Sequence, residues 1–303
     1  MMRLPYSRSS IERVGHRVGQ LYVERHLDIE GELVEEWTVP DDAKSISVVL
    51  DRVSVPMQEL VITKAAEEKV TRAWHMAYVG ALTLHDQEGK AIDTLRYARM
   101  PEGDIDSMAQ SLEADLLHAL SMRPDLVAVK LADGAVEMRR RLDEIVDGTV
   151  VDPVDLVDYW HVVEKVGAAA QAFTRSGLEA KHMTSLWQSW LLNHDDGAER
   201  VLAVLRRNAG RKAVDEAITY LDNNLTRMRY ADARRRGLPI GSGNVETSCK
   251  TTVRQRMNRG GVRWKHEPGE HVLHLRALAQ SDRWDAGITR ALRPLRKVVK
   301  RAA

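Results

Sequence analysis

The chain has 303 residues, 44% hydrophobic and 29% charged, so it is long enough to bury a full core and is not a disordered polymer. Its formal net charge is +1, but residues 24–59 hold ten acids against three Lys or Arg, whereas residues 227–265 hold eleven Lys or Arg against two acids. A single cysteine, Cys249, excludes an internal disulfide framework and fits a reducing compartment. With neither a signal peptide nor an apolar run of about 18 residues, we expect a cytoplasmic protein that does not engage a membrane.

The first expected element is a helix over residues 6–27. Its apolar residues recur at the spacing of one helical face, and Ser9 or Ser10 can cap it. Two interpretations remain open: a packing helix, or the last helix of a DNA-binding unit whose partners are missing.

A run rich in β-branched residues, SISVVLDRVSVPM, then predicts a strand that ends at Pro56. Apolar residues on both faces make this strand central. Asp51 lies in its middle, where an unpaired carboxylate would cost several kcal/mol unless it is protonated, paired or bound to a metal. Asp51 is therefore the first candidate ligand.

The stretches AWHMAYVGALTLHDQEG and AIDTLRYARM predict two further strands joined by a turn at Asp86 to Gly89, followed by a helix over residues 105–120. A short buried strand, PDLVAVKLADGA, ends at Asp133. Ligands gather at the carboxyl ends of strands in open sheets, which makes Asp133 the second candidate. The alternative is that Asp133 caps a helix over residues 135–145.

After a strand near residues 148–151, residues 155–173 predict a helix with Leu156, Trp160 and Val163 among its core positions. Asp158 and His161 fall three residues apart and hence on one helical face, although Asp155 could take the place of Asp158. Residues 174–233 are helical by pattern. Their tryptophans are expected in the core rather than stacked on bases. A basic amphipathic helix is expected over residues 283–302.

The stretch from Arg234 to Trp264 concentrates positive charge around one acid, Glu246. Such a stripe suits a phosphate backbone, and an acid inside it suits a divalent cation. Gly237 to Gly243 breaks the chain, Ser242 or Asn244 can cap a helix to about Asn258, and Gly260-Gly261 ends it. The alternative is a solvated helix in which Glu246 pairs with Lys250.

The strings GLPIGSGNVETSCK and RMNRGGVRW, followed by LRAL and DRW, resemble the C-terminal signature of bacterial insertion-sequence transposases of the ISKra type, which are Mutator-like enzymes of the DDE class. The resemblance spans roughly residues 6–284 but leaves out the N-terminal region with which that family recognises transposon ends. It implies an α/β, ribonuclease-H-like mixed sheet flanked by helices, with an all-helical insertion before the last catalytic helix.

It also implies a division into an N-terminal helical stub (1–43), the first part of the catalytic domain (44–173), the insertion (174–236) and the last part with basic helices (237–303). The family's triad falls on Asp51, Asp133 and Glu246, and its Asp-x-x-His motif makes Asp158 and His161 accessory residues. Three carboxylates suit two Mg²⁺ or Mn²⁺ ions in a polynucleotidyl transferase. The expected partners are double-stranded DNA and further copies of the chain on that DNA. The expected DNA-binding residues are Arg234, Arg235, Arg236, Lys250, Arg254, Arg256, Arg259, Arg263 and Lys265.

Other functions are weighed on the same residues. A tyrosine recombinase needs a nucleophilic tyrosine after its His and Arg cluster, and none follows Tyr230. A non-catalytic DNA-binding protein derived from a decayed transposase stays open, as does a structure-selective nuclease on the same fold.

Overall fold

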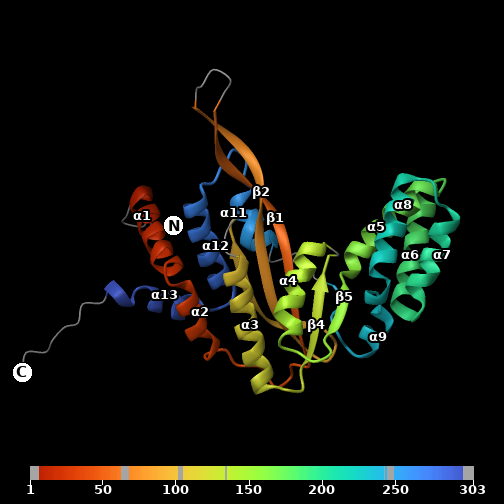
Figure 1. Cartoon of the computed structure of the whole chain (residues 1–303), viewed down its shortest axis with the longest axis horizontal. Coiled ribbons are helices and arrows are strands. Elements are labelled where there is room, and N and C mark those ends of the chain that lie inside the picture. Colours follow the sequence, from red (N-terminus) through yellow and green to blue (C-terminus); the bar gives the residue numbers. More distant parts are fainter. Residues whose placement is uncertain are drawn as a thin grey trace, which may run out of the picture.

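The computed structural model describes residues 7–62, 68–101, 105–133, 135–241, 243 and 249–295. Its strands form a mixed sheet in the order β3-β2-β1-β4-β5, in which β1, β2 and β3 are antiparallel and β1, β4 and β5 parallel (Figure 1). The bounds are β1 Ser45–Ile62, β2 Glu68–His85, β3 Ala91–Arg99, β4 Val127–Ala132 and β5 Val154–Val157. This strand order is ribonuclease-H-like, as expected. In the described part of the chain, no helix is both long and apolar enough to cross a bilayer.

The first strand is central, as its two apolar faces predict, but its predicted end at Pro56 is wrong. Strand β1 continues to Ile62, and Pro56 pairs with Trp74 on β2. The pairing of β1 with β4 ends at Val49. Beyond that point, no other strand among the described residues pairs with this edge of β1, so the missing N–H of Pro56 costs no hydrogen bond there. The carbonyl of Pro56 accepts a hydrogen bond from the Trp264 amide at 2.9 Å instead.

Two helical layers cover the sheet. Helices α3 (Ile105–Met122) and α4 (Val136–Asp147) bury one face, where Ile46, Val48 and Leu50 point. The other face is covered by the π-helix η2 (Cys249–Arg254), α11 (Gln255–Met257) and α12 (His266–Gln280). Because side chains alternate along a strand, Val49 and Val53 point to this second face, which we call the rear face. The predicted helix over residues 105–120 and the helix end near Asn258 are confirmed.

The fifth strand and the helix after it lie later than predicted. The strand expected at residues 148–151 is β5 at Val154–Val157, and the helix expected from residue 155 is α5, Tyr159–Phe173. Asp155 is therefore a strand residue. Trp160 was expected in the core but is 55% exposed, because the buried face of α5 runs through Tyr159, Val162 and Val166.

The helices of residues 174–236 share one core with α5 and the end of β5, at one end of the long axis of the molecule (Figure 1). Trp187 is fully buried there, which confirms its expected core position. The helices that follow α5 are α6 Gly177–Asn193, α7 Gly197–Arg207, α8 Lys212–Asn224, η1 Leu225–Arg227 and α9 Tyr230–Arg235.

The chain begins with two helices, α1 (Arg8–Val23) and α2 (His26–Val34), where one was predicted. Ser7 caps α1, rather than Ser9 or Ser10. Helix α1 packs on α12, so within the described residues it is a packing helix. The basic tail forms α13 (Trp284–Ala291) and η3 (Arg293–Leu295), and Arg293 pairs with Glu32 of α2 at 2.7 Å. Part of the acidic N-terminal charge is thus neutralised within the chain.

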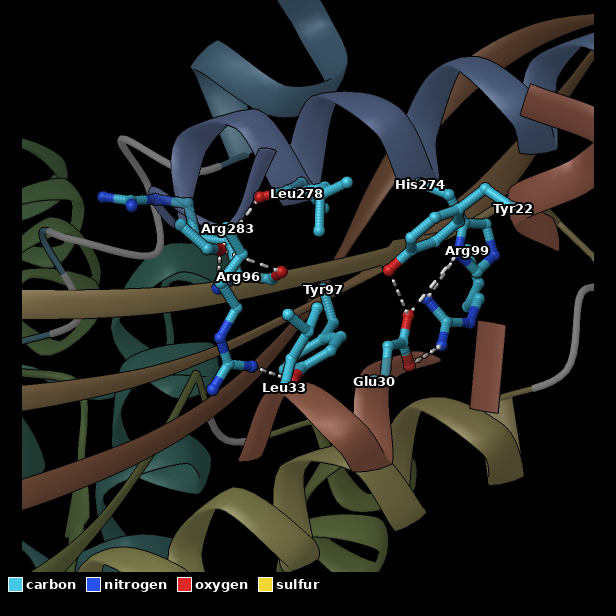
Figure 2. A pocket seen from close by; sticks show the side chains of 11 residues that line it. Tyr22, Glu30, Leu33, Arg96, Tyr97, Arg99, His274, Leu278 and Arg283 are labelled. Atoms are coloured by element: carbon cyan, nitrogen blue, oxygen red, sulfur yellow. Dashed lines mark hydrogen bonds and ion pairs between the residues drawn. The ribbon is translucent and has the colours of Figure 1, made fainter. Parts of the chain in front are cut away.

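A buried ionic cluster ties α2 to β3 and α12 (Figure 2). Glu30 accepts hydrogen bonds from Arg99 at 3.2 Å and from the Tyr22 hydroxyl at 3.4 Å. Although burial opposes ionisation, Arg99 and His274 lower the pKa of Glu30 to about 2. The cavity beside the cluster has a volume of only about 10 Å³, so this cluster holds helices together rather than binding a ligand.

Candidate active site

Neighbouring parallel strands bring Asp51 and Asp133 into register. Asp51 lies within β1, and Asp133 directly follows β4. The pairing of these strands sets Val49 opposite Leu131, so the residues two places further along are Asp51 and Asp133. Paired strands lie about 4.8 Å apart. The two acids that lie 82 positions apart in the sequence are therefore neighbours in the sheet.

Asp158 extends this arrangement to a third strand. Strands β4 and β5 pair Ala132 with Val157, so the next residues, Asp133 and Asp158, again stand opposite each other. The Asp158 amide donates to the Ala132 carbonyl at 2.8 Å, which continues the ladder one residue past β5. We call Asp51, Asp133 and Asp158 the acid row.

The acid row points to the rear face of the sheet. Val49 and Leu131 pack in the rear core, and side-chain alternation turns the positions two residues later to the same side. Asp51 and Asp133 therefore do not lie on opposite faces, an arrangement that would have ended the catalytic hypothesis. The rear face is also where Val253 and Met257 pack, from the helical turns that follow Glu246 in the chain.

The Asp133 carboxylate can still bind a cation, although one of its oxygens accepts a local hydrogen bond. Its Oδ1 accepts from the Ala135 amide at 2.8 Å. The N-cap residue of α4 is Ala135, and its side chain makes no capping bond. Asp133 is therefore not the N-cap that the alternative predicted; its bond to the Ala135 amide closes a turn before the helix. A carboxylate has lone pairs for several partners, so this bond leaves capacity for a cation.

Asp158 caps α5 and holds the ring of His161. Its Oδ1 accepts from the His161 amide at 3.0 Å and lies 3.2 Å from the ring Nδ1. The hydrogen bond to Asp158 raises the pKa of His161 to about 9, and the negative charge of Asp133 adds to this effect. His161 is therefore an imidazolium at neutral pH, next to two members of the acid row.

The alternative acid, Asp155, has another role. It alternates to the opposite side of β5, where it accepts from the Arg227 Nε at 2.8 Å. Arg139 of α4 lies 3.6 Å from it. Asp155 thus neutralises buried arginine rather than joining the acid row, and Arg227, at 4% exposure, is removed from any DNA-binding surface.

The segment from Gly237 to Gly241 leads the chain across the rear face to Asp158. Gly237 has a φ of +66°, and a Cβ there would lie 1.9 Å from the Gln87 carbonyl oxygen in the β2–β3 turn. At the other end, the Tyr159 amide donates to the Ile240 carbonyl at 3.0 Å. A Cβ on Gly241 would approach Trp160 to 2.9 Å and Asp158 Oδ2 to 3.7 Å. Both glycines are therefore required by close contacts.

Glu246, Ser242 and Asn244 lie outside the described residues, and so does the side chain of Lys250. The chain before them is anchored beside Asp158. After them, Thr252 donates to Gln280 at 2.7 Å, and the Asn258 side chain donates to the Ser54 carbonyl of β1 at 2.9 Å. The described flanks of Glu246 thus contact the two outer strands of the acid row: the first flank lies beside Asp158 after β5, and the second reaches β1 three residues beyond Asp51.

Among the described residues, no three His, Cys, Asp or Glu side chains form a group that could hold a metal ion. The acid row supplies the hard carboxylate oxygens that Mg²⁺ and Mn²⁺ prefer, but it does not complete a site by itself.

The predicted DNA-binding arginines fall into two groups. At the end of α9, Arg235 pairs with Asp195 at 2.7 Å, Arg236 lies 3.5 Å from Asp232, and Arg234 donates to the Leu192 carbonyl at 3.2 Å. The second group consists of exposed residues for which the described part of the chain offers no ion pair: Arg254, Arg256, Arg259, Arg263 and Lys265. This second group leaves more positive charge for an external anion.

Sequence reasoning missed Tyr220. Its hydroxyl, on α8 of the insertion, donates to the main-chain carbonyl of Asp133 at 2.8 Å. Burial and the charge of Asp133 raise the pKa of Tyr220. The contact spans 87 positions, and no local pattern marks a tyrosine on a helix for such a bond.

No protein-family model matches the chain, and no curated protein matches it. Among solved structures, it is similar to the Drosophila P element transposase strand transfer complex, with 11% sequence identity, a TM-score of 0.31, and coverage of 88% of this chain and 70% of that one. The fold assignment rests on the strand order rather than on this likeness.

Proposed function

We propose that this chain is a DDE transposase of the ISKra type, which cleaves DNA at insertion-sequence ends and joins those ends to target DNA. Asp51, Asp133 and Glu246 would hold two Mg²⁺ or Mn²⁺ ions. The observation that carries the proposal is the register of Asp51 and Asp133 on the rear face, the face on which the chain after Glu246 packs.

The geometry of the acid row suits a metal pair. Metal ions in two-ion sites lie about 3.5–4 Å apart, and neighbouring strands about 4.8 Å apart can present one carboxylate to each ion. The described residues alone do not complete such a site. Glu246 is the acid that the sequence supplies between the two anchored flanks, so we assign it the third position.

Bound ions would activate the attacking oxygen and stabilise the leaving one. Asp51, Asp133 and Glu246 would supply the negative charge that retains these ions, and the cation of His161, which is paired with Asp158, would be available to the scissile phosphate. In the first step a water molecule loses a proton as its oxygen bonds to phosphorus, the bond to the 3′ oxygen breaks, and that oxygen takes up a proton. In the second, the freed 3′-hydroxyl loses its proton as it bonds to a target phosphorus, and the 3′ oxygen that it displaces takes up a proton. The number of phosphate ester bonds is conserved in the second step.

The test compares Asp51→Asn, Asp133→Asn and Glu246→Gln in metal-dependent cleavage of a transposon-end duplex. Each removes a charge and keeps the side-chain size, so cleavage should fall about a hundredfold or more while DNA binding is kept. Asp152→Asn is the matched control, because Asp152 lies outside the acid row at a φ of +57° that asparagine tolerates.

Equal cleavage by wild type and Glu246→Gln would show that Glu246 is only the helical partner of Lys250, a change worth a few tenths of a kcal/mol in stability. A non-catalytic DNA-binding protein is the second candidate, favoured by the exposed cations Arg254, Arg256 and Arg259, which could bind phosphates without any metal site. It predicts DNA binding without cleavage by any variant. A nuclease on this fold would nick the duplex without joining its ends to a second DNA.

A further inference from the structure

A cleft of about 510 Å³ lies between α1, α12 and the strand-like segment around Trp264, apart from the acid row. Its volume falls within the range of about 300–1,000 Å³ that is usual for small-molecule sites. Helices α1 and α12 are in close contact at the inner end of the cleft. A Cβ on Gly19 of α1 would lie only 2.6 Å from the His271 Cβ on α12, so only glycine fits there.

The rim of the cleft is positively charged. Arg256, Arg263 and Lys265 line it, and no ion pair within the described chain neutralises them. Glu12 is the acid on the lining. The Arg256 guanidinium lies over the Trp264 ring at 5.0 Å, which holds the guanidinium in place without using up its charge.

The floor of the cleft is apolar. Val262, Val272 and Leu275 are partly buried there and leave apolar surface in contact with the cleft. Phosphates on a duplex surface would need the cations but not this floor. A ligand that fits both must combine an anionic group with a flat apolar one.

His271 adds a polar group without a partner. It lines the cleft, is 6% exposed, and its Nδ1 makes no hydrogen bond within the described residues. Burial lowers the pKa of His271, so its ring is neutral and presents one donor and one acceptor nitrogen. Buried polar atoms are normally paired, and the edge of a nucleobase carries both donors and acceptors.

We propose that this cleft binds a single unpaired nucleotide of the DNA, with its phosphate on Arg256, Arg263 and Lys265 and its base on the apolar floor beside His271. The inference rests on the proposed function only in taking DNA as the ligand. It assigns recognition of an unpaired base to the α1–α12 cleft, whose lining contains no member of the acid row.

Gly15 offers a variant that closes the cleft without altering its charge. It lies on the lining, and nothing stands within 4 Å of the position of a Cβ on it, so the backbone at this position accepts a side chain and Gly15→Phe should add a ring on the side of the cleft. Gly31→Phe is the matched control, because Gly31 is also helical and equally open but lies on α2, outside the cleft.

Binding is measured by fluorescence anisotropy of the full chain without divalent metal, so an absence of cleavage would not affect the result. Three labelled DNAs of one sequence are compared: a blunt duplex, the duplex with one unpaired thymidine, and the duplex with an abasic residue in its place. Wild type should bind the unpaired thymidine roughly tenfold more tightly than the other two. Gly15→Phe should remove this preference and leave blunt-duplex affinity unchanged, whereas Gly31→Phe should keep it.

Equal binding of the three DNAs by wild type would overturn the proposal, and so would a preference that survives Gly15→Phe. If the abasic and thymidine duplexes bound equally tightly, the cleft would hold phosphate alone. Displacement by an oligoglutamate peptide without any preference among the DNAs would assign the cleft to an acidic peptide.

Discussion

The pKa of His161 reports directly on the acid row, and Asp158→Asn is the change that isolates it. In the wild type, the hydrogen bond to Asp158 and the charge of Asp133 raise this pKa from an ordinary 6.5 to about 9. The difference corresponds to roughly 3 kcal/mol in favour of the imidazolium. Because the ring is 45% exposed, solvent screening reduces its contribution to stability to about 1 kcal/mol.

The direction in which stability changes with pH follows from the raised pKa of His161. The stabilisation is fully present below pH 6.5 and is lost as the pH rises through 9. Asp158→Asn should return the pKa of His161 toward its ordinary value and remove this part of the pH dependence. The same substitution keeps a hydrogen-bond acceptor for the His161 amide, so α5 retains its cap.

The assay is an NMR pH titration of the His161 ring proton, identified among the eleven histidines by its loss in His161→Gln. Addition of Mg²⁺ should lower the pKa of His161, because a divalent cation beside Asp133 and Asp158 opposes the field that holds the proton. Potassium at the same ionic strength serves as the control. A wild-type pKa near 6.5 would refute the pairing, and a pKa insensitive to Mg²⁺ would refute metal binding at this end of the row.

Two further predictions concern the close contact at Gly237 and the exposed basic residues. Gly237→Ala should destabilise the protein by about 2 kcal/mol or more in urea unfolding, because it combines a positive φ with a Cβ 1.9 Å from a carbonyl oxygen. Gly210→Ala has a φ of +96° but open space around it, so a loss as large as that of Gly237→Ala would show that the clash is unimportant. Arg254→Ala should reduce the salt dependence of DNA affinity by about one phosphate contact, and more than Arg235→Ala, which removes a residue already paired with Asp195. The reverse order would contradict the division of the arginines.

Local patterns predicted the existence of the three antiparallel strands, because each strand has at least nine residues, although β1 runs past its predicted end at Pro56. They failed at β5, a four-residue strand that follows Asp152 and Pro153 and carries Asp155 among its apolar residues. Such a short edge strand has too few positions to show alternation, so the following helix was predicted to begin too early.

The candidate acids could be selected from the sequence, but their register could not. Asp51 and Asp133 were selected by a buried position and a strand end, whereas their alignment depends on the pairing of strands that are far apart in the chain. The bond from Tyr220 to the Asp133 carbonyl is equally non-local. Counting charges along the sequence included Arg227 in the basic stretch, yet this residue is buried and paired with Asp155. Charge density alone does not reveal which arginines are buried.

The rear face of the sheet has a consequence for how the chain is made. Its apolar strand residues, such as Val53 and Val55, appear early in synthesis, whereas Val253, Met257 and Leu273, which cover them, come from the last fifth of the chain. About 200 further residues must therefore be synthesised after Val53 and Val55 before this surface is covered. Until then the nascent chain exposes the apolar surface of these strands, which favours chaperone binding or aggregation. Products of termination before residue 249 lack Val253, Met257 and Leu273, and they should therefore be insoluble.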